Sequence, residues 1–174
     1  MPAPARTVVD NRIAPDEFRR VLGHFCSGLT IVTSLADGPD GDEPVGFTCQ
    51  SFASLSLEPP LVTFSVARTS TTWPRIEPSG AFCVNILTAG QEALCQSFAL
   101  RGADRFDGVR WAPGPATGSP VLAGSLAWAD CTLEAVHPGG DHEIVVGRVR
   151  AMEVTSADDT PLLFYRSAFH RPAA

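Results

Sequence analysis

The 174-residue sequence lacks features that mark several common functional classes. It has no excess of basic residues, since 13 basic residues against 19 acidic ones leave a net charge of −6. Nucleic-acid-binding proteins use such an excess to neutralise phosphates, so we expect no nucleic-acid partner. It also has no apolar run near the roughly 20 residues that span a bilayer, so we expect no membrane partner.

The cysteines lack the clustering that a disulfide framework or a zinc site would need. None is spaced as C-x-x-C, and each lies among small or apolar neighbours, where free cysteine behaves as a small hydrophobe. Residues 1–12 contain no apolar signal core, so secretion is not expected. We therefore expect reduced core thiols and a cytoplasmic location. The five cysteines are Cys26, Cys49, Cys83, Cys95 and Cys131.

Nucleotide and hydrolase motifs are absent as well. No G-x-G-x-x-G, no P-loop and no G-x-S-x-G occurs, which leaves a Rossmann site, a P-loop site and a hydrolase elbow unsupported. Asp104-Arg105-Phe106 by itself predicts only a charged loop with an aromatic anchor. With 44% hydrophobic residues, the chain is expected to form one domain over 1–174, with its core at about 16–167.

The apolar pattern predicts a mainly β chain. A helix is expected over 15–27, where Phe18, Val21, Leu22 and Phe25 form one helical stripe. Because most consecutive strands lack a crossover helix, an antiparallel barrel with peripheral helices is expected. Further helices are expected at 73–76 and 91–100, a hairpin turn at 37–42, a loop at 111–120, and strands at 29–35, 44–49, 61–66, 81–87, 122–136, 143–154 and 162–165.

A polar segment at 46–56 lies between two of these strands. Its hydroxyl and amide groups could serve a planar heteroaromatic ligand that both donates and accepts hydrogen bonds. The alternative interpretation is a Ser/Thr-rich connection that satisfies its own backbone. Both interpretations stay open at this point. The side chains concerned are Thr48, Gln50, Ser51, Ser54 and Ser56.

A second polar segment at 65–72 precedes the expected helix at Trp73. It contains Arg68 and ends in four consecutive hydroxyl residues at 69–72. Free N–H groups and the helix dipole favour an anion there, which points to a phosphate. The alternative is an N-cap by Thr71 or Thr72, which would explain one hydroxyl but not four.

The segment 137–143 gathers two histidines, an aspartate and a glutamate. Its spacing matches no zinc pattern, and Pro138-Gly139-Gly140 favours a tight turn over a helix, so no metal site is predicted. A metal site would also have a poor ligand count. A solvent-facing turn histidine and a His142 that handles a substrate both remain open.

An ordered set of short motifs resembles the flavin reductases with an FMN-binding split barrel. These are the small components that feed reduced flavin to two-component monooxygenases. The set covers roughly residues 16–167, and its order is more specific than any single motif. The matching stretches are 18–28, 32–33, 45–52, 55–62, 82–87, 104–106, 140–142 and 161–166.

The resemblance implies a mainly β split barrel of Greek-key type with peripheral helices, and it implies roles for the polar segments. His142 would be the catalytic residue, and Asp141, His142 and Tyr165 would contact the nicotinamide. Hydride would pass to the flavin while the protein aligns the two rings. The flavin-binding residues would be Pro44, Val45, Gly46, Phe47, Thr48, Gln50 and Ser51 at the ring, Ser65, Val66, Ala67, Thr71 and Thr72 at the phosphate, and Phe98.

The resemblance also implies cofactors and partners. FMN or FAD would be reduced by NADH or NADPH, and the product would go to a separate monooxygenase. Members usually form homodimers with flavin near the subunit interface. Two other classes compete: a flavin-using barrel that acts directly on an organic substrate, and a non-catalytic flavin-binding module. Gly140-Asp141-His142 favours the reductase over the module, and the small size favours it over the direct enzyme.

Overall fold

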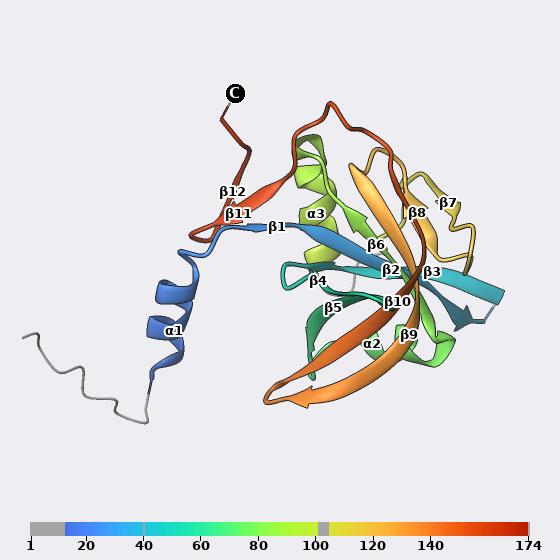
Figure 1. Ribbon diagram of the computed structural model, residues 1–174, viewed down its shortest axis with the longest axis horizontal. Helices are drawn as coiled ribbons and strands as arrows, with labels where there is room; N and C mark the ends of the chain where they lie inside the picture. The colour runs from blue at the N-terminus through green and yellow to red at the C-terminus, as the bar shows by residue number, and fades with distance from the viewer. Residues whose placement is uncertain (1–12, 40, 101–104, 174) are drawn as a thin grey trace, which may run out of the picture.

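The computed structural model describes residues 13–39, 41–100 and 105–173. Within these ranges the chain is mainly strand, as predicted (Figure 1). The helices are α1 (Pro15–Leu22), α2 (Trp73–Ile76) and α3 (Glu92–Ala99), with 3-10 turns at Glu77–Ser79 and Ala89–Gln91. The strands are β1 (Ser27–Gly28), β2 (Thr30–Gly38), β3 (Gly41–Cys49), β4 (Ala53–Leu57), β5 (Pro60–Ala67), β6 (Ala81–Ile86), β7 (Trp111–Pro113), β8 (Pro120–Leu122), β9 (Ala127–Gly139), β10 (His142–Val154), β11 (Leu163–Tyr165) and β12 (Ala168–His170).

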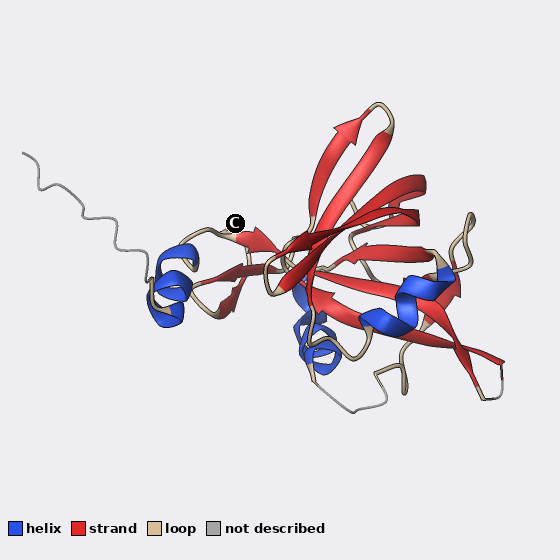
Figure 2. Ribbon diagram, turned by 90° about the horizontal axis from the view of Figure 1, so that it is seen from below, coloured by secondary structure: helices blue, strands red, loops and turns tan. Residues whose placement is uncertain are grey.

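Seven of these strands form one antiparallel sheet in the order β3-β2-β6-β9-β10-β5-β4. Register shifts at Val146/Gly147 and Val149/Ala151 interrupt the β9–β10 ladder, and such irregularities bend a strand and increase its twist. The sheet is strongly curved (Figure 2), and its end strands β3 and β4 are not paired with each other. The expected hairpin is present, with Thr30 opposite Cys49 and Gly38 opposite Gly41.

Two apolar clusters hold this sheet. The barrel interior is built on Phe64 and Phe82, whose rings meet edge to face at 5.3 Å, and α2 adds Trp73 and Ile76 to it. A second cluster lies between α3 and the sheet, where Phe98 packs with Ile31 and Leu87. Burying these aromatic and branched side chains supplies the main driving force for the fold.

The first helix differs from the expectation in length and in packing. It ends at Leu22 with Gly23 as its C-cap, so Phe25 lies beyond it. Its apolar stripe exists, but α1 has no buried residue, and Phe18 and Phe25 are 54% and 78% exposed. Figures 1 and 2 show α1 beside the small β1-β11-β12 sheet and away from the barrel.

Three expectations for loops and strands were wrong. The segment 111–120 is not all loop, because β7 pairs with β8 as a two-stranded sheet. Residues 123–126 do not belong to a strand, since β9 begins only at Ala127. The polar stretch at 46–56 includes β4, an edge strand that pairs with β5 and exposes Leu57 almost completely.

Candidate functional site

Two adjoining clefts lie where β3, β5 and β10 end. The first, which we call the His142 cleft, has a volume of about 390 Å³, and the second, the hydroxyl cleft, about 380 Å³. They share Phe47, Thr48, Gln50 and Ser70, so they form one continuous depression. The His142 cleft also includes Cys49, Ser51, Ser65, Val66, Ala67 and His142, and the hydroxyl cleft includes Leu29, Thr71, Thr72, Cys95, Phe98, Ala99, Arg105, Phe164 and Phe169.

His142 reaches its cleft through the β9–β10 hairpin. Gly140 has a φ of +74°, a conformation that glycine adopts without steric cost, and the turn starts β10 at His142. The register then sets His142 opposite Ala67 at the end of β5. Its Nδ1 lies 2.7 Å from Asp141 Oδ1. The predicted nicotinamide residues Asp141 and His142 are therefore in contact.

The Asp141 carboxylate is almost fully exposed, and its hydrogen bond with His142 lowers its pKa, with the attraction of the imidazolium as a second cause. The backbone C=O of Asp141 accepts the N–H of Arg68 at 3.0 Å, which ties the hairpin tip to the loop after β5. The carboxylate therefore stays ionised at neutral pH and can hold the imidazole in one orientation.

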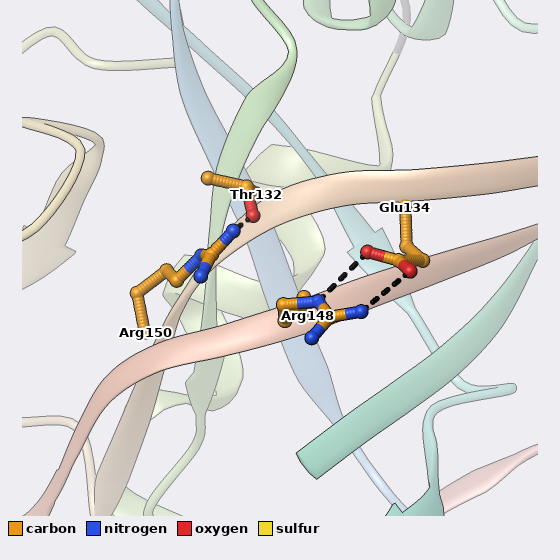
Figure 3. A network of polar contacts seen from close by, with 4 residues as sticks. All are labelled: Thr132, Glu134, Arg148 and Arg150. Carbon is orange, nitrogen blue, oxygen red and sulfur yellow. Dashed lines mark hydrogen bonds and ion pairs between the residues drawn. The ribbon is translucent and has the colours of Figure 1, made fainter. Parts of the chain in front are cut away.

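A polar pair links the two strands of this hairpin at some distance from its tip. Arg148 on β10 donates from Nε and Nη2 to both carboxylate oxygens of Glu134 on β9, at 2.9 and 2.7 Å (Figure 3). Arg150 Nε donates to Thr132 Oγ1 at 2.9 Å. The Arg148 hydrogen bond lowers the pKa of Glu134, so the pair stays ionised across the neutral range.

The hydroxyl groups of the first polar segment serve mainly to fasten strands. Ser51 Oγ accepts the N–H of Ser65 at 2.8 Å and donates to its C=O at 3.0 Å, which bridges β3 to β5. Thr48 Oγ1 donates to the C=O of Cys95 at 2.6 Å and fixes α3. Gln50 is exposed and lines both clefts. The segment thus satisfies backbone groups, as the second interpretation predicts, and it also borders both clefts, while ligand binding by it stays a prediction.

The second polar segment is capped differently from the expectation. Ser70, rather than Thr71 or Thr72, accepts the N–H groups of Thr72 and Trp73, at 3.3 and 3.1 Å. The helix that follows, α2, is only four residues long, so its dipole is small. The expected help from a helix N-terminus is therefore weak, and an anion here would depend on side chains.

The predicted ring-binding residues Pro44, Val45 and Gly46 border a third cleft of about 270 Å³, together with Arg75 and Arg105. Gly46 permits close packing, because a Cβ there would lie 2.9 Å from Phe98 Cε1 and 2.8 Å from the C=O of Val32. Phe98 itself is fully buried at the wall of the hydroxyl cleft. Pro44, Val45 and Gly46 thus border the third cleft and Phe98 borders the hydroxyl cleft. None of the four lines the His142 cleft.

Tyr165 does not line any of these three clefts. Its ring packs edge-on against His24 and His170, at 6.0 and 5.9 Å, on the small sheet beside α1. Its neighbours Phe164 and Phe169 line the hydroxyl cleft instead. The structure therefore brings together the polar segments and His142 but not Tyr165.

Sequence reasoning assigned no role to Arg105, although it borders both the hydroxyl cleft and the third cleft. Its Nη1 donates to the C=O of Gly46 at 2.6 Å and to Thr72 Oγ1 at 2.7 Å. Burial lowers its pKa. The 104–106 motif was its only sequence signal, and Asp104 lies outside the described residues.

A larger cavity of about 520 Å³ lies elsewhere, bordered by Asp37, Asp42 and Ser79, and includes none of the predicted site residues. Arg75 also borders this cavity, but its guanidinium is ion-paired with Glu43, so the two carboxylates disfavour a phosphate there. In the parts of the chain that the structure describes, no helix has the length and apolar character to cross a membrane. No three His, Cys, Asp or Glu side chains among those residues gather closely enough to hold a metal.

The curled antiparallel sheet, with polar clefts at the ends of its strands, has the split-barrel architecture of solved flavin reductases. The chain belongs to the flavin reductase family, because the family described as "Flavin reductase like domain" matches residues 22–173.

Individual relatives agree with this membership. The chain is 51% identical over 162 residues to the flavin-dependent monooxygenase reductase subunit HsaB of Rhodococcus jostii, covering 93% of this chain and 80% of that one. It is 40% identical over 154 residues to the FMN reductase (NADH) of Agrobacterium fabrum, covering 88% and 84%. The NADH:FAD oxidoreductase of Streptomyces globisporus, solved with NAD and FAD fragments, superimposes with a TM-score of 0.83 at 35% identity, covering 94% and 98%.

Proposed function

We propose that this chain is an NADH-dependent flavin reductase that reduces FMN or FAD and passes the reduced flavin to a separate monooxygenase. One observation carries the proposal. His142 lines one of two adjoining clefts and the hydroxyl groups of Thr71 and Thr72 line the other, and the two clefts share four lining residues. The names of the relatives, which include FMN, FAD, NADH and a monooxygenase reductase subunit, support the same reaction.

The depression suits a flavin in its donors, acceptors and shape. Gln50 offers an amide that both donates and accepts, and the end of β5 at Val66 and Ala67 lines the same cleft. The partly buried Phe47 and the buried Phe98 supply apolar contact. Thr71 and Thr72 provide hydroxyl groups at the far end. We assign the ring to the shared part of the clefts and the phosphate to the hydroxyl end.

The nicotinamide is assigned to the open side of the His142 cleft. Flavin bound there would accept a hydride from NADH, so the chain needs no acid–base pair of its own. His142 would contact the nicotinamide and hold its ring over the flavin, with Asp141 fixing the imidazole through Nδ1. Tyr165 keeps its predicted nicotinamide role only if its sheet moves or a second subunit brings it to the cleft.

We further propose that residues 1–174 form one such domain and that it works as a homodimer in the cytoplasm. The exposed stripe on α1 supports the dimer, because an amphipathic helix of a globular protein normally buries its apolar face. Four of the five free cysteines are buried, which suits a reducing compartment.

The test is to follow oxidation of NADH and of NADPH with added FMN, FAD or riboflavin. We expect turnover with NADH and at least one phosphorylated flavin. We also expect a purified flavin-dependent monooxygenase to hydroxylate its substrate when this chain, NADH and flavin are the only source of electrons. No oxidation with any pair of nucleotide and flavin would contradict the proposal.

A further inference from the structure

A positive charge would stabilise the flavin phosphate, and few positively charged side chains line the two clefts. The sequence contains no lysine, so all 13 basic residues are arginines, and the net charge is −6. Among the described residues that line the His142 cleft and the hydroxyl cleft, Arg105 is the one arginine. A phosphate at the hydroxyl end would therefore depend on this side chain for charge.

Arg105 is held among neutral acceptors. Its Nη1 donates to Gly46 and Thr72 as described, while Nε and Nη2 both donate to the C=O of Leu100, at 3.0 and 2.6 Å. No carboxylate forms an ion pair with it within the ranges 13–39, 41–100 and 105–173. The guanidinium charge is thus fixed in position without being neutralised.

Three donors on residues that line the hydroxyl cleft remain unused among the described residues. The four hydrogen bonds leave one N–H of Nη2 without an acceptor in the described part of the chain. Thr72 Oγ1 accepts from Arg105, so its own proton is available to a further acceptor. The backbone N–H of Thr71 donates to no group among the described residues. An anion here would meet a guanidinium, a hydroxyl and an amide together.

We propose that Arg105 binds the phosphate of the flavin, with the Thr72 hydroxyl as its partner. This inference rests on the proposed flavin reductase function and adds the residue that supplies the charge. The phosphate accepts the free Nη2 proton and the Thr72 proton, while the bonds to Gly46 and Leu100 hold the guanidinium in place. Such charge-assisted bonds are about twice as strong as neutral ones.

Arg68 was the arginine that the sequence offered for this role. It is exposed, its side chain makes no hydrogen bond or ion pair with the described residues, and it borders neither cleft. Its backbone N–H serves the hairpin tip instead. Arg68 therefore provides a matched control that removes one arginine from the same loop.

The experiment compares the dissociation constants of FMN and riboflavin, which differ only by the phosphate, by quenching of flavin fluorescence. Arg105→Met should raise the FMN constant about 10- to 100-fold and the riboflavin constant less than about 3-fold. Arg105→Lys should keep part of the preference for FMN, because it keeps the charge without the fork. FMN binding by the unmodified protein should weaken with salt, and that dependence should diminish in Arg105→Met.

Arg68→Gln should leave both constants unchanged. Equal losses of FMN and riboflavin in Arg105→Met would overturn the inference, because they would show that Arg105 only braces the Gly46 and Leu100 backbone. Where Arg105→Met does not fold, Arg105→Gln keeps a donor for the Gly46 carbonyl and the same comparison decides. Failure of the unmodified protein to bind any flavin would instead contradict the proposed function.

Discussion

His142 combines exposure, a fixed partner and a place in the cleft. Its side chain is 45% exposed, and the Asp141 carboxylate 2.7 Å away restrains its ring. We predict that His142→Ala lowers kcat/KM for NADH by about 100-fold, the scale of loss that misplacing a reactant by about 1 Å can cause. The flavin dissociation constant should stay nearly unchanged. Stopped-flow hydride-transfer rates and flavin titrations measure the two effects separately.

The rival roles of His142 predict other patterns. A metal ligand would make activity sensitive to chelators, and a purely structural turn histidine would lower the melting temperature without changing hydride transfer. Hydride-transfer rates equal to those of the unmodified protein would show that His142 does not position the nicotinamide.

Asp141 leads to a prediction about pH. Its hydrogen bond with His142 lowers its pKa below the ordinary value of about 4. Because a lowered carboxyl pKa means that the pair persists as pH falls until that lower pKa is reached, kcat/KM for NADH should show no inflection from Asp141 between about pH 5 and 8. Asp141→Asn should weaken kcat/KM less than His142→Ala does. A larger loss in Asp141→Asn would assign the direct contact to Asp141.

Asp130 is a fully buried carboxylate with a structural task. Its Oδ2 accepts the N–H groups of Ala116 and Thr117, at 2.9 and 3.0 Å, and Thr117 also donates its hydroxyl to Oδ1. We predict that Asp130→Asn destabilises the fold by about 2–3 kcal/mol, because a neutral amide oxygen would replace a charged acceptor for the two N–H groups and the amide NH₂ would face the Thr117 hydroxyl, which would lose its acceptor. Urea unfolding measures this, and a change under about 0.5 kcal/mol would mean that the loop finds other partners.

At the scale of elements, β10 passes over the barrel core at Gly147. A Cβ there would lie 2.3 Å from Cζ of Phe82, a fully buried ring. We predict that Gly147→Ala destabilises the protein by about 1–3 kcal/mol through overpacking. Gly28→Ala is the matched control, since nothing lies within 4 Å of its Cβ position. Equal melting temperatures for the two variants would show that β10 can shift away from Phe82.

The elements that the sequence predicted well are those defined by local pattern. The hairpin of β2 and β3 follows from a β-branched strand and a Gly/Asp turn, and α2 follows from Trp73-Pro74. β4 was missed because its serines read as a polar connection, although pairing with β5 makes it a strand. The low strand propensity of the serines is overridden there by pairing with β5, which the local sequence pattern of β4 does not reveal.

The candidate site also has a part that local sequence predicts and a part that depends on distant contacts. Polar segments in sequence marked the clefts, but the use of each hydroxyl depended on partners far along the chain. Arg105 lies 59 residues from Gly46 and 33 from Thr72, so only the folded chain brings its charge to the hydroxyl cluster. Arg68 was favoured by proximity in sequence, which is a weak guide where loops from distant strands meet.

At the scale of the whole molecule, the protomer keeps an apolar surface on α1. The helix was correctly read from its stripe, yet Phe18, Val21 and Leu22 are each at least half exposed. Isolated helices of this length are marginal in water, so an eight-residue helix needs packing to persist. A second copy of the chain is the partner we propose, since closed symmetric dimers are the commonest soluble oligomers.

We therefore predict a dimer of twice 18.4 kDa by light scattering, and its dissociation in the double variant Phe18→Glu/Phe25→Glu. Two charges on the stripe would have to be buried in the interface, which costs several kcal/mol per unpaired ion. Val154→Glu is the control, because Val154 is also exposed (63%) but lies at the end of β10 away from His142. An unmodified protein that is monomeric and still reduces flavin would refute the dimer. A dimer that survives the double variant would move the interface away from α1.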